Sequence, residues 1–315
     1  MRDLRIVFMG TPEFAVHSLK SIVEAGYRVV GVVTAPDRPA GRGRKLQESA
    51  VKKYSLEQGL QVMQPTNLKD EAFIKELQLL NPNLQVVVAF RMLPKVVWDF
   101  PQFGTFNLHA SLLPQYRGAA PINWAIMNGE ELTGVSTFFL DEKIDTGEMI
   151  LQKSVKIEPN ENAESLHNKL MEIGADLVLD TLNLIQSEKI KTQSQPKDVV
   201  LKEAPKLTKE NTRIDWGRPL DEIYNFIRGL SPYPVAWTPF WNSGNEMTLK
   251  IFEAEKEFQA HKLDIGKIIQ EGKSIKVAVN NGFLILKKIQ LPGKRKMPVK
   301  DLLNGFKFYP DAKVM

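Results

Sequence analysis

Three polar side chains near the middle of the chain are suited to acyl-transfer chemistry. Asn107 and His109 lie two apart in the apolar run 105–109, so on a strand both point to the same side. An amide and an imidazole can hydrogen-bond an acyl oxygen, and the imidazole can also carry a proton. Asp145 could support proton removal from an attacking amine by orienting water or His109. Taken singly, a hydrogen-bonded structural histidine and a turn aspartate are the commoner interpretations.

The residues around this pattern favour the catalytic interpretation. Ser111-Leu112-Leu113-Pro114 predicts an extended, apolar lip whose proline cannot continue a helix. Arg117-Gly118 then supplies a cation and a turn before a helix that starts near Pro121.

An alternation of strands and helices must position these residues. Apolar runs at 4–9, 27–34, 61–63, 85–90 and 105–109 predict strands, and helical patterns at 12–24, 51–58 and 70–80 separate them. Thr11 is expected to cap the first helix, with Pro12 at its first position. We therefore expect an α/β fold with a Rossmann-like, doubly wound, mostly parallel sheet, whose sites lie at the carboxyl ends of its strands. Residues 9–13 lack the three spaced glycines of a dinucleotide fingerprint, which argues against a dehydrogenase.

The second half of the chain predicts a smaller domain. A strand at 148–155 and a long helix at 163–187 complete a catalytic domain over 1–189, and the polar, proline-containing stretch 190–208 is typical of a linker. Beyond it come a helix at 220–230 and short strands at 248–253, 266–270, 275–279 and 283–290. These predict an OB-like β-barrel over 209–315.

Composition narrows the class of protein. The chain of 315 residues contains no cysteine, which excludes disulfides, thiolate catalysis and sulfur-ligated metals, and we expect no metal. No apolar run approaches the roughly 20 residues that span a membrane, and no signal peptide is indicated, so we expect a cytoplasmic enzyme. Residues 190–315 carry 22 Lys and Arg against 14 Asp and Glu, or +8, whereas residues 1–189 carry 20 against 23, or −3. A basic second half suggests a polyanionic partner, although solubilising lysines explain it equally well.

The segments NLHASLLPQYRGAAPINW and DTGEMI resemble the catalytic core of the formyltransferases that use 10-formyltetrahydrofolate. The resemblance implies that Asn107, His109 and Asp145 form the reacting centre. It also implies a folate-binding set, with 10-formyltetrahydrofolate as co-substrate: Ser111, Leu112, Leu113, Pro114, Arg91, Met92 and Leu93. The segment 89–94 is one residue shorter than is usual in the tRNA-modifying branch and is more similar to the purine branch.

The acceptor is indicated by the basic segment APDRPAGRGRK at 35–45, whose prolines and glycines predict a loop between the second strand and the next helix. It resembles the loop by which methionyl-tRNA formyltransferases reach the acceptor end of initiator tRNA. Segments at 206–209, 213–216 and 230–234 resemble the C-terminal domain of that branch. The implied tRNA-binding residues are Arg38, Arg42, Arg44 and Lys45.

We therefore expect transfer of a formyl group to the amino group of initiator methionyl-tRNA, for translation initiation. The sequence implies neither an association with a membrane nor a stable protein partner. Two alternatives stay open. One keeps the chemistry but has a nucleotide-sugar or purine-precursor amine as acceptor. The other is a non-catalytic RNA-binding protein, which would leave Asn107, His109 and Asp145 without a purpose.

Overall fold

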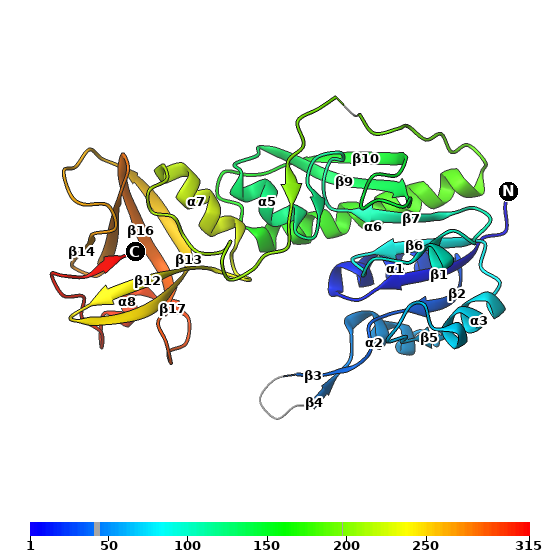
Figure 1. Ribbon diagram of the computed structural model, residues 1–315, viewed down its shortest axis with the longest axis horizontal. Helices are drawn as coiled ribbons and strands as arrows, with labels where there is room; N and C mark the ends of the chain where they lie inside the picture. Colours follow the sequence, from blue (N-terminus) through cyan, green and yellow to red (C-terminus); the bar gives the residue numbers. More distant parts are fainter. Residues whose placement is uncertain (41–44, 197) are drawn as a thin grey trace. The chain divides into compact units, whose positions relative to one another are not determined.

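The computed structural model describes residues 1–40, 45–196 and 198–315. The chain forms two compact units (Figure 1). The first unit comprises residues 1–118, 133–155 and 167–203, and the second comprises residues 119–132, 156–166 and 204–315. The division at 189 and 209 expected from the sequence stays a prediction about which parts of the chain fold independently. None of the helices in the described ranges is long and apolar enough to cross a membrane.

The first unit is built on a seven-stranded sheet with the order β10-β9-β7-β6-β1-β2-β5 (Figure 1). Its strands are β1 (Arg5–Gly10), β2 (Arg28–Val33), β5 (Val62–Met63), β6 (Leu84–Val88), β7 (Thr105–His109), β9 (Leu132–Phe139) and β10 (Met149–Lys156). The neighbouring strands β5, β2, β1, β6 and β7 pair in parallel in that order, whereas β7 and β9 are antiparallel. From β1 the chain winds outward to β5 and then returns to β6 on the other side of β1. The predicted doubly wound, mostly parallel sheet is confirmed.

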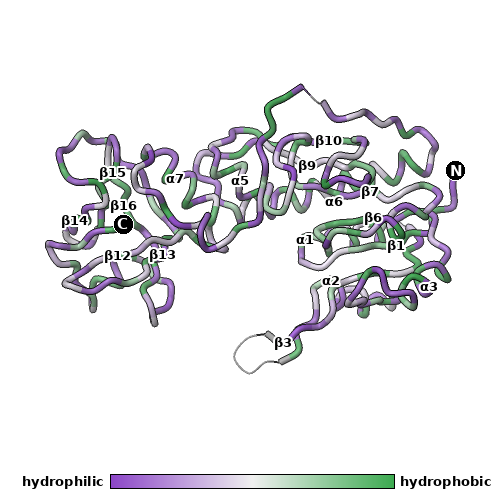
Figure 2. Tube along the Cα trace, in the orientation of Figure 1, coloured by the Kyte–Doolittle hydropathy of each residue, from purple (hydrophilic) through white to green (hydrophobic). Residues whose placement is uncertain are grey.

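Helices cover both faces of this sheet. Val7 and Met9 of β1 and Val87 of β6 pack in one cluster with residues of α3 (Glu71–Leu79) and α4 (Lys95–Trp98). On the opposite face lie α1 (Glu13–Glu24) and α6 (Ala163–Gln186), where Leu108 of β7 touches Gly174 of α6. Figure 2 shows hydrophobic residues along β1 and β6, in keeping with strands that are buried on both faces.

The start of α1 differs from the sequence prediction. Its N-cap is Pro12 and the helix begins at Glu13, without a side-chain cap hydrogen bond. The predicted Thr11 cap is therefore wrong by one residue. By contrast, Ser49 caps α2 (Ala50–Glu57) and Asp70 caps α3, each accepting backbone N–H bonds as capping residues do.

A short antiparallel hairpin leaves the first unit between β2 and α2. Its strands are β3 (Arg38–Ala40) and β4 (Lys45–Gln47), with Arg38 opposite Gln47 and Pro39 opposite Leu46. The segment expected to be a loop thus has paired strands at its base. Arg42 and Arg44 lie outside the described residues.

The second unit contains the predicted OB-like barrel, which is confirmed. Its sheet has the order β14-β15-β16-β13-β12-β18, with β17 beside β16. Backbone hydrogen bonds from Ile268 and Val314 bring the two end strands together, so the barrel is nearly closed. The elements are β12 (Ala236–Asn242), β13 (Asn245–Phe258), β14 (Ile268–Glu271), β15 (Ser274–Val279), β16 (Gly282–Gln290), β17 (Met297–Pro298), α8 (Val299–Leu302) and β18 (Lys313–Val314).

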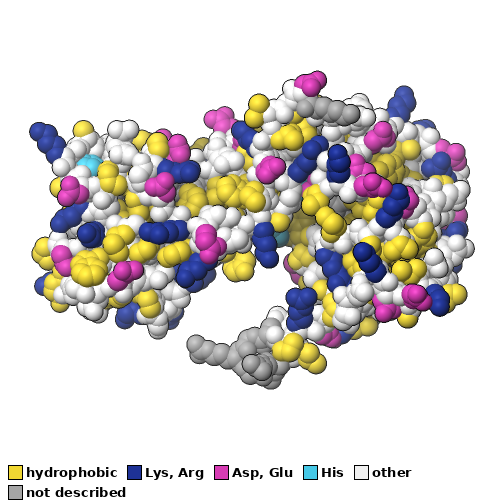
Figure 3. All heavy atoms as spheres, in the orientation of Figure 1, with side chains coloured by type: hydrophobic (Ala, Val, Ile, Leu, Met, Phe, Trp, Pro, Cys, Tyr) yellow, Lys and Arg dark blue, Asp and Glu magenta, His cyan; other side chains and the backbone are white. Residues whose placement is uncertain are grey.

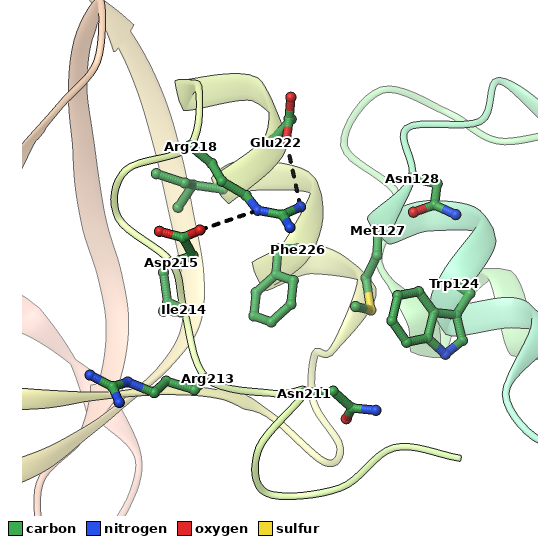
Figure 4. Close-up of a pocket in the computed structure, with 11 residues that line it drawn as sticks. Trp124, Met127, Asn128, Asn211, Arg213, Ile214, Asp215, Arg218, Glu222 and Phe226 are labelled. Atoms are coloured by element: carbon green, nitrogen blue, oxygen red, sulfur yellow. Dashed lines mark ion pairs between the residues drawn. The ribbon is translucent and has the colours of Figure 1, made fainter. Parts of the chain in front are cut away.

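Two helices complete this unit, α5 (Pro121–Met127) and α7 (Leu220–Gly229). They approach closely because Gly229 has no side chain: a Cβ there would lie 2.7 Å from Cγ of Met127. Between α5, α7 and the segment 211–218 is a cleft of about 230 Å³, which Figure 4 shows with Phe226 and Met127 facing each other. Arg218 borders it and pairs with Asp215 and Glu222 at 3.5 and 3.6 Å.

Candidate active site

Asn107 and His109 both lie on β7, on the face away from α6. The imidazole of His109 is buried, and its Nε2 lies 2.8 Å from the carbonyl oxygen of Tyr116. Because a carbonyl oxygen only accepts hydrogen bonds, Nε2 must carry a proton, which leaves Nδ1 for other chemistry. The half-buried amide of Asn107 has no hydrogen-bond partner among the described residues.

Asp145 comes from the loop between β9 and β10, and its carboxylate reaches the other nitrogen of His109. Oδ2 lies 3.8 Å from Nδ1 of His109 and accepts a hydrogen bond of 2.9 Å from the backbone N–H of Gly118. The two side chains are only 7% and 14% exposed, so solvent screens an ion pair between them weakly. The fold thus brings together His109 and Asp145, which are far apart in the sequence.

The backbone of Asp145 adopts an unusual conformation, with φ of 55°. Residues with a Cβ rarely occupy this left-handed region, and such strain persists only where the surroundings hold it in place. Gly147 fits tightly two residues later, since a Cβ there would lie 1.7 Å from the carbonyl oxygen of Phe139. The loop that carries the carboxylate is therefore closely constrained.

Gln195 is a buried residue of this site that the sequence did not reveal. Its Nε2 donates to the carbonyl oxygens of Asp145 and Gly147, both at 2.9 Å. Its Oε1 accepts from Nη2 and Nε of Arg117 at 2.6 and 3.3 Å. Gln195 lies in the stretch expected to be a linker, and its partners are 48 to 78 positions away. No local pattern could have indicated these contacts.

The segment from Ser111 to Pro114 is fixed mainly through its backbone. Ser136 of β9 donates to the carbonyl oxygen of Ser111 at 2.6 Å and accepts from the N–H of Leu113 at 3.2 Å. Gln152 of β10 donates to the carbonyl oxygen of Leu113 at 2.9 Å. The side chains of Ser111 and Leu113 are buried, whereas Leu112 and Pro114 are half-buried. The expected folate contacts of this segment stay a prediction.

The other three residues expected to bind folate differ in their burial and contacts. Arg91 donates to the carbonyl oxygens of Thr66 and Pro65, and desolvation together with nearby Arg38 lowers the pKa of its guanidinium. Met92 is 69% exposed, whereas Leu93 is buried in the core against α4. Their roles also stay predictions.

A cleft of about 380 Å³ opens at the carboxyl ends of β1, β2 and β6. This is the place where the winding of the sheet reverses, which is where open α/β sheets bind ligands. Its lining contains Arg91, which is expected to bind folate, and Arg38, which is expected to bind tRNA. The other lining residues are Thr11, Ala35, Pro36, Gln47, Glu48, Ser49 and Phe90.

The base of the β3–β4 hairpin is anchored by charge. Asp37 pairs with Lys52 of α2 and accepts from Nε2 of Gln64 at 2.8 Å, while Lys52 also pairs with Glu48 at 3.0 Å. Hydrogen bonds from Lys52 and Gln64 lower the pKa of Asp37, and the bonds to Asp37 and Glu48 raise the pKa of Lys52. Of the expected tRNA-binding residues, Arg38 lines the cleft, and Lys45 belongs to β4.

The positive charge of the second unit is partly neutralised within the barrel. Lys288 pairs with Glu253, Lys287 with Glu255 and Lys276 with Glu257, at 2.9, 3.1 and 2.8 Å. Figure 3 shows the basic side chains of this unit spread among acidic ones on the face in view. An exposed ion pair such as Lys287–Glu255 contributes little to stability, so its main effect is on the surface potential.

Comparisons with known proteins find formyltransferases along both halves of the chain. The model of the formyl transferase family matches residues 4–182, and that of the formyl transferase C-terminal domain matches residues 206–307. A methionyl-tRNA formyltransferase of Flavobacterium johnsoniae is 57% identical over 314 residues, covering 100% of both chains. Another from Bacteroides thetaiotaomicron is 54% identical over 310 residues, covering 97% of this chain and 96% of the other.

A solved structure with the same fold is that of an N-formyltransferase from Helicobacter canadensis in complex with folinic acid and dTDP-3-aminofucose. It is 20% identical, has a TM-score of 0.63, and covers 90% of this chain and 98% of its own. At this identity the likeness shows the fold alone, whereas the relatives that match along their full length show the family. The chain belongs to the methionyl-tRNA formyltransferase family.

Proposed function

We propose that the protein transfers a formyl group from 10-formyltetrahydrofolate to the amino group of methionine esterified to initiator tRNA. The observation that carries this proposal is the 57% identity to a methionyl-tRNA formyltransferase over the full length of both chains. The arrangement of Asn107, His109 and Asp145 at the carboxyl end of β7 supports it, because these groups suit acyl transfer to an amine. The folinic acid in the Helicobacter canadensis structure supports a folate donor.

Asn107 is the group available to stabilise negative charge. Its amide is uncommitted among the described residues, so it can donate a hydrogen bond to the formyl oxygen as charge develops there. When bound, 10-formyltetrahydrofolate supplies the formyl carbon, which bonds to the methionyl nitrogen while its bond to N10 breaks. This donor chemistry needs an oxyanion partner and a proton acceptor, and the side chains present fit that requirement.

His109 and Asp145 move the proton. Nε2 of His109 is committed to the carbonyl oxygen of Tyr116, so Nδ1 is the nitrogen that accepts a proton from the attacking amine. Asp145, 3.8 Å from Nδ1, stabilises the positive charge that then forms on the ring. The same proton is returned to the leaving nitrogen N10, which leaves His109 and Asp145 in their starting states.

The basic hairpin is assigned to the tRNA. Arg38 lies in the cleft at the carboxyl edge of the sheet, and Arg42, Arg44 and Lys45 follow it in sequence. Cations that neutralise phosphates release counterions, so binding of this kind weakens steeply as salt is raised. Affinity for methionyl-tRNA that did not change with salt would contradict this assignment.

The proposal is tested by offering two acceptors to the same enzyme. With 10-formyltetrahydrofolate as donor, charged initiator tRNA should be formylated at least about ten-fold more efficiently than an amino-sugar nucleotide, since a ten-fold ratio needs only about 1.4 kcal/mol of preference. His109→Ala should reduce formylation of the tRNA while leaving its affinity nearly unchanged. An amino-sugar nucleotide that outcompetes the tRNA would overturn the proposed acceptor.

A further inference from the structure

We propose that Gln195 is a positioning residue for formyl transfer, which holds the loop of Asp145 so that the carboxylate meets His109. This inference rests on the role of Asp145 in the proposed function. It adds a residue from outside the segments that resemble the catalytic core of the family, within a stretch whose sequence is typical of a linker.

The amide of Gln195 is fully used and its orientation is fixed. Nε2 has two N–H groups, which go to the carbonyl oxygens of Asp145 and Gly147, and Oε1 accepts two N–H bonds from Arg117. Turning the amide over would set its NH₂ against the guanidinium and its oxygen against two carbonyls. The network therefore assigns the oxygen and the nitrogen without ambiguity. With only 6% of the residue exposed, water cannot replace these partners easily.

These contacts hold the two chain segments that determine the position of the Asp145 carboxylate. Gly118, whose N–H binds Oδ2 of Asp145, directly follows Arg117, whose guanidinium is bound by Gln195. The other side of the same amide binds the backbone at Asp145 and Gly147. One buried amide thus ties the hydrogen-bond donor of the carboxylate to the loop that carries it.

The loop requires such a constraint because its backbone is strained. Asp145 has φ of 55°. The hydrogen bond from the backbone N–H of Gly118 fixes the side-chain carboxylate of Asp145, but it does not fix the backbone peptide groups of the loop. Gln195 fixes the carbonyl groups on both sides of Thr146. Without it, the loop can relax toward an ordinary conformation and carry the carboxylate away from Nδ1 of His109. The distance between these atoms is already 3.8 Å, so a further shift would weaken their coupling.

Gln195→Met removes all four hydrogen bonds at similar length, and Gln193→Met is its matched control. The side chain of Gln193 is exposed and has no hydrogen-bond partner among the described residues, since only its backbone bonds to Met149. We expect Gln195→Met to lower the single-turnover rate of formyl transfer by about 100-fold, because misplacing a catalytic group by about 1 Å costs this much. KM for the donor should change little, and Gln193→Met should match the unmodified enzyme.

The decisive measurement is a double-mutant cycle with Asp145→Ala. If Gln195 acts through Asp145, Gln195→Met should cost less than about two-fold in the Asp145→Ala background, because coupled residues are not additive. A residue that only supports the fold would give equal losses in both backgrounds, and that result would overturn the inference. So would a normal rate in Gln195→Met.

A second variant keeps the inference testable if Gln195→Met does not fold. Gln195→Glu preserves size and the contact with Arg117 but replaces both donors with an acceptor, which repels the carbonyls of Asp145 and Gly147. It should also lose about 100-fold in rate, the cost of misplacing a catalytic group by about 1 Å, and an unchanged rate would refute the inference. The role of Asp145 in the proposed function is tested separately, because a normal rate of formyl transfer in Asp145→Ala would refute that role whatever the result with Gln195.

Discussion

Gly147→Ala tests how closely the loop of Asp145 is constrained. The new Cβ would lie 1.7 Å from the carbonyl oxygen of Phe139 and 2.9 Å from its carbonyl carbon. Because real Cβ contacts stay above 3.0 Å, the loop or the end of β9 must move by about 1.3 Å, the difference between 3.0 and 1.7 Å. Overpacking of this kind costs about 1–3 kcal/mol, or about 2–12 °C in Tm for a domain of this size. A shift of about 1 Å near a reacting group costs about 100-fold in rate.

Two assays separate these effects. Circular dichroism during heating gives the Tm, and single-turnover formylation at a temperature where the variant is folded gives the rate. Gly305→Ala is the control, since a Cβ there meets no atom within 4 Å and it should change neither value. If Gly147→Ala keeps the Tm and the rate of the unmodified enzyme, the argument that this loop positions Asp145 by close packing is refuted.

Further predictions concern four other parts of the molecule. Asn107→Ala should lower the rate by roughly 10²–10³-fold without weakening tRNA binding in a filter assay, as loss of one oxyanion donor does; an unchanged rate would exclude that role. Arg42→Ala should reduce formylation of tRNA more than that of a minimal amine acceptor, and equal losses would mean that the hairpin shapes the active site instead. Lys52 and Gln64 lower the pKa of Asp37, so the stability that Asp37 contributes is present above pH 3.8 and is lost as the pH falls through its folded pKa. The stability difference between the unmodified protein and Asp37→Asn in urea unfolding should therefore vanish in acid, and a difference that persists there would contradict the pairing. Phe240 is fully buried, and Phe240→Ala should destabilise the barrel by about 3–5 kcal/mol in urea unfolding, unlike an exposed control such as Phe258→Ala.

The sheet of the first unit was predictable because its strands are locally distinctive. Runs such as Leu84–Val88 are buried on both faces and strongly apolar, and helices with clear periodicity separate them. This alternation implies the parallel order, and the order places the end of β7 at the edge where sites form. Asn107 and His109 could thus be assigned to one side of a strand from spacing alone.

Strands β9 and β12 were not predicted, because their sequences carry signals that usually end a strand. Gly134 in β9 suggests a break, yet the close approach of β10 requires a glycine there, since a Cβ would lie 2.2 Å from the carbonyl oxygen of Lys153. Pro239 interrupts the pattern of β12, although the strand continues and pairs with β13 through this position. In both places tertiary packing overrides local propensity.

The polar contacts of the site could not be derived from the sequence either. Tyr116 turns its carbonyl oxygen toward His109, and Gln195 reaches a loop 48 to 50 residues away. Such contacts depend on the three-dimensional course of the chain and leave no periodic pattern. They also refine the chemistry, because the bond to Tyr116 leaves only Nδ1 of His109 for proton transfer.

The central claim is tested most directly by recovering N-formylmethionine from tRNA. The purified protein is incubated with 10-formyltetrahydrofolate and charged initiator or elongator methionyl-tRNA, and the amino acid is released and identified. We predict N-formylmethionine from the initiator tRNA in far greater yield than from the elongator, dependent on the donor and strongly reduced in His109→Ala and Asp145→Ala. Failure to formylate charged initiator tRNA, or an undiminished yield with both variants, would contradict the account.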